Sequence, residues 1–142
     1  QKMILNRFQA VTRVNDLFVY EYDTVQYDAA DYWRVLDVDA EKDEGDCEDY
    51  ALTVAWLLAE RSRFKFLKML LTGKFKICYV TVNGGGHAIL EYEGMYVDNW
   101  KRQWTLRSEY ELDYAKYDWT YKYAFNPFVV ITKLIMGKFW KK

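Results

Sequence analysis

The chain has few of the residues that cross-link or interrupt a fold: two cysteines, one proline, one histidine and seven glycines in 142 residues. Its two cysteines, Cys47 and Cys78, follow no repeated spacing, which excludes a disulfide-rich scaffold. No apolar run approaches the ~20 residues that a membrane-spanning helix needs. No secretory signal is visible. Because the chain starts at Gln1 rather than at methionine, a processed N-terminus stays open.

Hydrophobic side chains are abundant: they make up 51% of the chain, and aromatic ones 19%. This composition excludes a disordered chain. The length fits one domain, residues 1–142, with a single core. The formal net charge of −1 argues against a general nucleic-acid binder, which carries a basic excess, so we expect no nucleic-acid partner.

Charge is distributed unevenly along the chain. Residues 21–60 hold thirteen acidic and two basic side chains. Residues 61–76 hold six basic side chains and no acidic one, and residues 121–142 hold five lysines and no acidic residue. Such segregation is typical of solvated faces, and also of a surface oriented towards a charged partner. The sequence leaves both interpretations open.

Hydrophobic periodicity predicts an α+β fold. Apolar residues at helical spacing predict helices over residues 3–20, 47–62, 64–71 and 127–140, with a further short helix near 29–37. β-branched and aromatic runs predict strands over 75–82, 87–93, 95–100 and 119–125. Helices first and hairpins afterwards are typical of helices packed on an antiparallel sheet.

Cys47 stands at the predicted start of an apolar helix. Asp46 is a good N-cap, with Asp49 at the third helical position, so Cys47 falls on the first helical residue. There the helix dipole and the free backbone N–H groups favour a thiolate. The same N–H groups could donate hydrogen bonds to an oxyanion. The neighbouring carboxylates, including Glu48, act against the thiolate. Activation therefore needs a base, or a cation that neutralises the acids.

The only histidine, His87, is the natural candidate for that base. It opens a predicted strand, and a hairpin turn at 93–94 would place residues 89 and 98 opposite each other. His87 and Asp98 could then lie side by side as a general base and its orienting carboxylate. A lone histidine in a strand is also compatible with a purely structural role. Cys78, which alternates with apolar neighbours, is interpreted as a small buried residue.

Two segments resemble a known family. "GDCEDYA" at Cys47, followed by "GHAILEYEGMYVDNW", resembles the bacterial transglutaminase-like cysteine peptidases, which include periplasmic proteases that cleave surface adhesins. "DYW" at 31–33 resembles the upstream tryptophan segment of that family. The resemblance covers about residues 31–100, roughly half of the chain. It implies a papain-like fold, in which a helix bearing the catalytic cysteine packs on an antiparallel sheet.

The resemblance also implies roles for individual residues. Cys47 would be the nucleophile, His87 the base and Asp98 the orienting acid. Asp46 and Glu48 match positions that bind Ca²⁺ in the adhesin proteases, although Asp46 as a simple helix cap is an equally physical interpretation. Trp33 would donate its indole N–H to the oxyanion, or would be only a packed core aromatic. The resemblance implies no required cofactor, with Ca²⁺ as an optional one.

The chain departs from the family in ways that bear on substrate and compartment. "WRVLDVDAEKDEG" lacks the proline common after the upstream tryptophan, and the chain is shorter than the adhesin proteases. A compact member with no visible signal and an aromatic, lysine-rich tail would suit a bacteriophage-encoded protein. The location would be cytoplasmic or virion-associated for a phage protein and periplasmic for a processed bacterial one.

Three functions stay open at this stage. The first is a hydrolase that cleaves an amide bond in a protein or peptide through an acyl-enzyme. The second is acyl transfer to an amine, as in transglutaminases. The third is a non-catalytic binding module on the same fold, such as a phage structural or host-interaction protein. Residues 127–142 carry apolar side chains and lysines, which favour core packing or docking on a membrane or partner.

Overall fold

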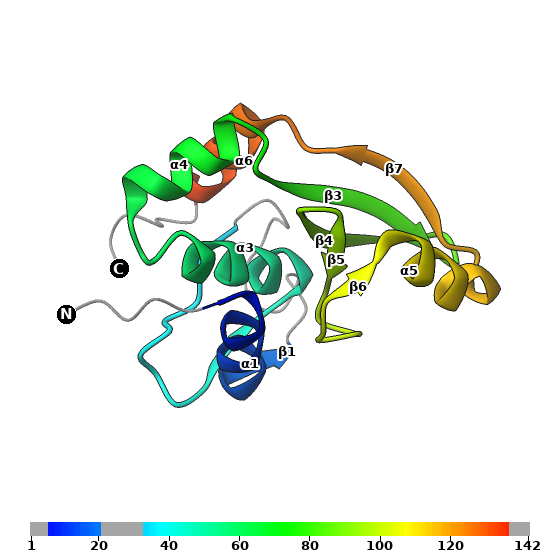
Figure 1. Cartoon of the computed structure of the whole chain (residues 1–142), viewed down its shortest axis with the longest axis horizontal. Helices are drawn as coiled ribbons and strands as arrows, with labels where there is room; N and C mark the ends of the chain where they lie inside the picture. Colours follow the sequence, from blue (N-terminus) through cyan, green and yellow to red (C-terminus); the bar gives the residue numbers. More distant parts are fainter. Residues whose placement is uncertain (1–5, 21–32, 137–142) are drawn as a thin grey trace.

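The computed structural model describes residues 6–20 and 33–136. Its centre is an antiparallel sheet of five strands in the order β6-β5-β4-β3-β7 (Figure 1). The strands are β3 (Phe75–Val82), β4 (Gly85–Tyr92), β5 (Met95–Val97), β6 (Thr105–Leu106) and β7 (Thr120–Ala124). A separate parallel pair joins β1 (Phe18–Tyr20) to β2 (Asp43–Gly45). The architecture is α+β, as the sequence predicts.

Helices cover the sheet from both sides. They are α1 (Arg7–Leu17), α3 (Cys47–Leu58), α4 (Arg63–Leu71), α5 (Arg107–Tyr114) and α6 (Pro127–Met136), with a short 3₁₀ turn, η1 (Ala115–Tyr117), after α5. Helix α3 packs against β4 and is flanked by α1, while α4 contacts both β3 and α6 (Figure 1). Helix α5 packs against β5 and β6.

The strand alternation divides the buried side chains into two clusters. Leu90 and Ala88 of β4 point into the main core, which α1, α3 and α4 complete. Ile89 of the same strand points to the opposite face, where Tyr96 and Tyr110 form a smaller, aromatic cluster under α5. His87 shares the face of Ile89, because residues two apart in a strand point the same way. Helix α3 thus packs on the face of Ala88 and Leu90, and α5 packs on the opposite face.

Most predicted elements are confirmed, with shifted ends. The first helix begins at Arg7 and ends at Leu17, where the chain turns into β1. The third predicted strand ends at Val97, because the chain turns after Asp98 and donates two backbone N–H groups back to its carboxylate. The helix that begins at Cys47 ends at Leu58, four residues early, and two residues of positive φ follow.

Other differences are elements that periodicity alone does not mark. Strands β2 and β6 are two or three residues long, and α5 has only one buried residue. Residues 33–36 are not helical; the rest of the short helix expected near 29–37 lies partly outside the described residues. The last helix is confirmed from Pro127, with Asn126 accepting from the Phe128 N–H at 2.8 Å, and its predicted extension to residue 140 lies outside them.

Candidate active site

The N-terminus of α3 presents Cys47 as the first helical residue, as the sequence predicts. Asp46 accepts a hydrogen bond from the Asp49 N–H at 3.2 Å, and Asp49 accepts one from the Asp46 N–H at 3.3 Å, which is a reciprocal capping box. Gly45 precedes the cap because a Cβ there would lie 2.9 Å from the Asp49 Cβ. The "GDCED" motif is thus a packed helix start whose geometry fixes the position of the cysteine.

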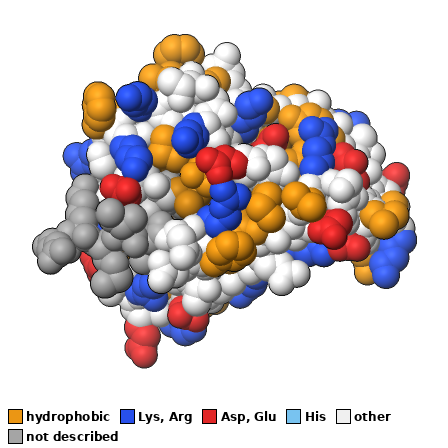
Figure 2. Space-filling model, in the orientation of Figure 1, with side chains coloured by type: hydrophobic (Ala, Val, Ile, Leu, Met, Phe, Trp, Pro, Cys, Tyr) orange, Lys and Arg blue, Asp and Glu red, His pale blue; other side chains and the backbone are white. Residues whose placement is uncertain are grey.

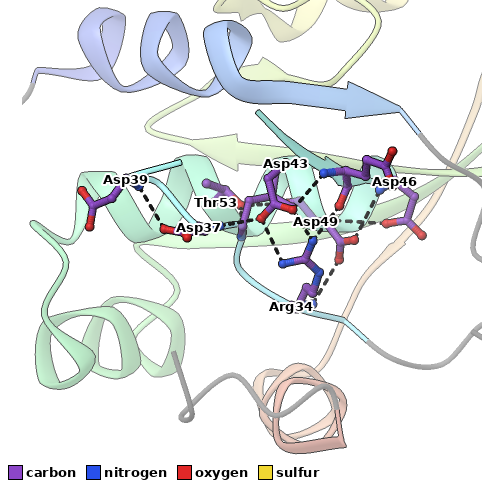
Figure 3. Close-up of polar contacts among 9 residues, drawn as sticks. Arg34, Asp37, Asp39, Asp43, Asp46, Asp49 and Thr53 are labelled. Carbon is purple, nitrogen blue, oxygen red and sulfur yellow. Dashed lines mark hydrogen bonds and ion pairs between the residues drawn. The ribbon is translucent and has the colours of Figure 1, made fainter. Parts of the chain in front are cut away.

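A network centred on Arg34 fastens the segment before α3 to this helix start (Figure 3). The Arg34 guanidinium donates to both carboxylate oxygens of Asp43, at 2.8 and 3.2 Å, and its backbone N–H donates to Asp49 at 3.0 Å. Burial of Asp43 acts to raise its pKa, but the hydrogen bonds and charge of Arg34 outweigh it, and the pKa is lowered. The network holds Asp49, and with it the helix cap, in place.

His87 and Asp98 lie together, as the predicted hairpin register requires. The pairing of Leu90 with Val97 continues to bring residues 89 and 98 opposite each other. The His87 Nε2 lies 2.8 Å from Asp98 Oδ2, and both side chains are buried. A carboxylate accepts, so Nε2 carries the proton and Nδ1 is the ring nitrogen with the free lone pair. Such an imidazole is oriented to act as a base at Nδ1.

Asp98 is surrounded by hydrogen-bond donors only. Its Oδ2 accepts from His87 and from the Tyr110 hydroxyl, and its Oδ1 accepts from the backbone N–H groups of Trp100 at 3.1 Å and Lys101 at 2.7 Å. Burial acts to raise the pKa of Asp98, but these hydrogen bonds outweigh it and the pKa is lowered. The pKa of Tyr110 is raised by burial and by Asp98, so its hydroxyl stays protonated as a donor.

Trp100 covers the imidazole. Its ring stacks on His87 with centroids 3.8 Å apart and planes at 8°, and half of its surface is exposed. This stacking fixes the plane of the imidazole and shields one side of the His87–Asp98 hydrogen bond from water. Sequence reasoning missed Trp100 and Tyr110 as site residues. Trp100 stands two residues after Asp98, a usable signal, whereas Tyr110 comes from α5, which the sequence pattern does not show.

Cys47 approaches the same strand at the residue after the histidine. Its sulfur lies near the backbone N–H of Ala88, which acts to lower the thiol pKa, and it donates a hydrogen bond to Glu48 Oε2 at 2.9 Å. Burial, together with the charges of Glu48 and Asp46, raises the pKa of Cys47 well above the ordinary value. Among the described residues no hydrogen bond joins the sulfur to the imidazole. Burial and the neighbouring acids thus both disfavour the thiolate.

Asp46 and Glu48, the two acidic residues beside Cys47, are buried close together, which disfavours their charged forms. The carboxyl groups of Asp46 and Glu48 lie within hydrogen-bonding reach, and burial followed by the charge of Asp46 raises the pKa of Glu48 to about 9. Burial also raises the pKa of Asp46. Glu48 Oε1 is buried and has no hydrogen-bond partner among the described residues. A cation between the two groups would fit this chemistry.

The fit to a calcium ion is partial. Calcium takes about six to eight oxygen ligands, and the described residues contain no group of three or more acidic, histidine or cysteine side chains that could hold a metal. Asp46 and Glu48 are therefore candidates for two ligands of such an ion, and calcium binding stays a prediction.

Trp33 lies in the main core. Its ring meets Phe125 edge-on, with centroids 5.0 Å apart, and the Lys133 ammonium lies 5.4 Å above it. The structure thus gives Trp33 a packing role and does not test the predicted oxyanion role.

Replacing Trp33 by phenylalanine separates the two roles. The change keeps most of the core volume and removes the indole N–H. If the indole donates to the oxyanion, we expect the rate of Cys47 acylation by p-nitrophenyl acetate to fall by about 100-fold, the cost of one such donor. Trp56→Phe, a change of the same type on α3, is the control. An acylation rate equal to wild type in Trp33→Phe would leave Trp33 as a core residue only.

The architecture defines the site as a cysteine at a helix N-terminus beside a histidine–carboxylate pair on an antiparallel sheet, within an α+β fold. No family model and no curated protein matches the sequence. Among solved structures, LapG of Legionella pneumophila matches with a TM-score of 0.55 and 20% identity, over 84% of this chain and 63% of that one. EGTA-treated LapG matches with a TM-score of 0.56 and 20% identity, over 84% and 61%.

This similarity shows a shared fold. The chain spans less than two thirds of the LapG chains that it matches.

Proposed function

We propose that the protein is a thiol hydrolase that cleaves an amide bond in a protein or peptide through Cys47, His87 and Asp98. One observation carries the proposal: the Cys47 sulfur lies against the backbone of Ala88, and the preceding residue, His87, is bonded to a buried carboxylate. A histidine with only a packing role does not require a buried carboxylate as its partner. A cysteine with only a packing role does not require a position at a helix N-terminus.

The reaction uses the free nitrogen of the imidazole. His87 Nδ1 takes the proton of the Cys47 thiol, and the thiolate attacks the substrate carbonyl to form a tetrahedral intermediate. The imidazolium then protonates the leaving amine as the C–N bond breaks, which leaves a thioester on Cys47. Water, deprotonated at the same nitrogen, hydrolyses the thioester. Asp98 holds the tautomer and stabilises the imidazolium throughout.

The negative charges of Asp46 and Glu48 must be offset before the reaction begins, because they disfavour the Cys47 thiolate. After burial, the charge of Glu48 and the hydrogen bond that it accepts from the thiol raise the pKa of Cys47. When bound, a calcium ion held by Asp46 and Glu48 would offset their negative charge and so lower the thiol pKa. These two residues bind and orient; they take no covalent part. The proposal therefore describes an enzyme whose nucleophile is protonated until its acidic neighbours are neutralised.

The fold match to LapG supports a distant relationship to the peptidase family that the "GDCEDYA" motif resembles. Hydrolysis is favoured over transfer to an amine by that resemblance alone, because the same thioester serves both reactions. Within residues 6–20 and 33–136, no contact specifically favours the binding-module alternative. It predicts that the biological effect survives in Cys47→Ala.

Alkylation of Cys47 tests the proposal directly. The full chain is treated with iodoacetamide at pH 7 in millimolar calcium, and modification of Cys47 and Cys78 is followed by peptide mass spectrometry. We expect Cys47 to react much faster than Cys78, whose burial raises its pKa to about 12. His87→Ala should slow Cys47 by about 100-fold, the usual contribution of a general base. Cys78 is the internal control within every sample.

The opposite result is equally clear. If Cys47 reacts like an ordinary thiol in both proteins, with and without calcium, the triad does not activate it. A hydrolase would then be ruled out at this site, and the binding module would be the better description.

A further inference from the structure

Helix α4 carries an exposed face that is both basic and apolar. Phe64 and Leu71, two helical turns apart, lie on one face and are 77% and 49% exposed. Lys68 lies between them on the same face and is exposed. The opposite face buries Phe66, Met69 and Leu70 in the core. Helix α4 therefore has a well-packed buried face, and Phe64 and Leu71 are exposed in addition to it.

A groove adjoins this face. It has a volume of about 450 Å³ and lies between α4 and the end of β4. Three lysines line it together with apolar side chains: Lys65, Lys68 and Lys74, with Leu58, Met69 and Tyr92. Figure 2 shows Lys and Arg side chains interspersed with hydrophobic ones over the part of the molecule where α4 and α6 lie in Figure 1. The groove can thus take an anionic group that carries an apolar chain.

The charge balance of this region is positive. Residues 61–76 contain six basic side chains and no acidic one. Three acidic residues reach it from outside: Asp39 pairs with Arg61 at 2.7 Å, Glu60 pairs with Lys65 at 3.0 Å, and Glu93 lies 4.0 Å from Lys74. Among the described residues Lys68 is in no ion pair. The neighbouring helix α6 contacts α4 and exposes Phe128 and Ile135, 68% and 55%.

We propose that the α4 face, defined by Phe64, Lys68, Leu71 and the lysine-lined groove, docks on the surface of a bilayer that contains anionic phospholipid. The lysines match the phosphate groups, and the spaced apolar side chains enter the acyl boundary. A bilayer accepts such isolated side chains without shape complementarity. A protein partner would need about 800 Å² of continuous matching surface, and here lysines interrupt the apolar groups. None of the described helices is long and apolar enough to cross the bilayer.

This docking would leave the cysteine site accessible. Leu58, at the groove, and Cys47 are the last and first residues of α3, so they are separated by about 16 Å along the helix axis at 1.5 Å per residue. The inference goes beyond the proposed hydrolase and is independent of it.

Vesicle co-sedimentation of the full chain tests the docking. One set of vesicles is pure phosphatidylcholine, and the other contains phosphatidylcholine and phosphatidylglycerol in equal parts. We expect binding to the anionic vesicles that weakens with added salt. Lys68→Glu combined with Lys74→Glu should weaken it at least about thirtyfold, because each lost positive charge near an anionic surface costs about fivefold and the added carboxylates are repelled. The matched control, Lys116→Glu with Lys122→Glu, makes the same change in net charge away from α4 and should bind like wild type.

A second pair of variants tests the apolar contribution. Phe64→Ser should reduce binding, whereas Leu112→Ser, an equally exposed residue on α5, should not. Thermal melts establish that each variant folds, and Lys68→Gln with Lys74→Gln replaces the charge reversal if that variant does not.

Three results would overturn the docking. The first is equal binding to both kinds of vesicle, and the second is an equal loss in both lysine pairs. The third is that polyglutamate displaces the protein from anionic vesicles while Phe64→Ser leaves vesicle binding unchanged. That result would indicate an acidic protein as the partner of this face. Alkylation of Cys47 in the Lys68/Lys74 variant should match wild type. Vesicle binding therefore tests the docking alone, and Cys47 alkylation tests the hydrolase alone.

Discussion

Asp98→Asn is expected to lower the rate of Cys47 acylation by p-nitrophenyl acetate by about 10⁴-fold, the cost of the wrong imidazole tautomer in a triad. The four hydrogen-bond partners of Asp98 are all donors, two to each carboxylate oxygen. Only a side chain with two acceptor atoms can therefore satisfy all four. An amide must turn its NH₂ either to the two backbone N–H groups or to His87 and Tyr110. In the second orientation the imidazole accepts at Nε2 and carries its proton at Nδ1, where the base is needed.

Controls separate the tautomer from a loss of fold. Asp113→Asn makes the same chemical change at an exposed carboxylate and should acylate like wild type. Tyr110→Phe keeps the charge of Asp98 and removes one donor, so we expect a loss well below that of Asp98→Asn. Thermal melts of all three variants accompany the kinetics. A folded Asp98→Asn protein with the wild-type acylation rate would reduce Asp98 to a structural residue.

The sequence predicts the parts of this site that are local. The capping box needs only the spacing of Asp46 and Asp49, and the approach of His87 to Asp98 needs only a two-residue turn at Glu93–Gly94, where φ is positive at both residues. Each is set within about ten residues of chain. The predicted roles of Cys47, His87 and Asp98 in catalysis go beyond these positions and stay predictions.

The parts that sequence reasoning missed depend on contacts between distant segments. Tyr110 reaches Asp98 from α5, a helix with one buried residue, so hydrophobic periodicity gives no signal for it. Arg34 fixes the helix cap through Asp43 and the Asp49 carboxylate, a network that no spacing rule contains. Burial is the largest cause that raises the pKa of Cys47, ahead of the neighbouring carboxylates, and the local sequence does not give the degree of burial.

Stability should fall as pH rises when no cation is present. Burial raises the pKa values of Asp46, Glu48 and Asp49, and the charge of Asp46 further raises those of Glu48 and Asp49, so the folded state binds more protons than the unfolded one. This contribution is fully present below the ordinary carboxyl pKa and is lost as pH rises through the folded value, about 9 for Glu48. At 1.36 kcal/mol per unit, the shift of Glu48 corresponds to at most about 6 kcal/mol.

The pKa of Asp98 is lowered, so its contribution has the opposite sign and is lost only on acidification below the ordinary value of 3.8. In EDTA the protein should therefore be most stable on the acidic side of neutrality. Thermal melts between pH 4.5 and pH 9 measure this. A melting temperature that rises steadily with pH would show that the cluster is ionised and compensated in the folded state.

Calcium should remove this pH dependence if Asp46 and Glu48 bind it. Millimolar calcium would then raise the melting temperature strongly at pH 8 and little at pH 4.5, where protons compete for the same oxygens. Glu48→Gln should abolish the calcium response and reduce the decline with pH, to which Asp46 and Asp49 still contribute. Glu41→Gln, an exposed control, should keep both at the wild-type level. If calcium leaves the melting temperature and Cys47 alkylation unchanged, the two carboxyl groups share a proton instead of a metal. Activation of the thiol would then rest on His87 alone, which the alkylation of His87→Ala measures.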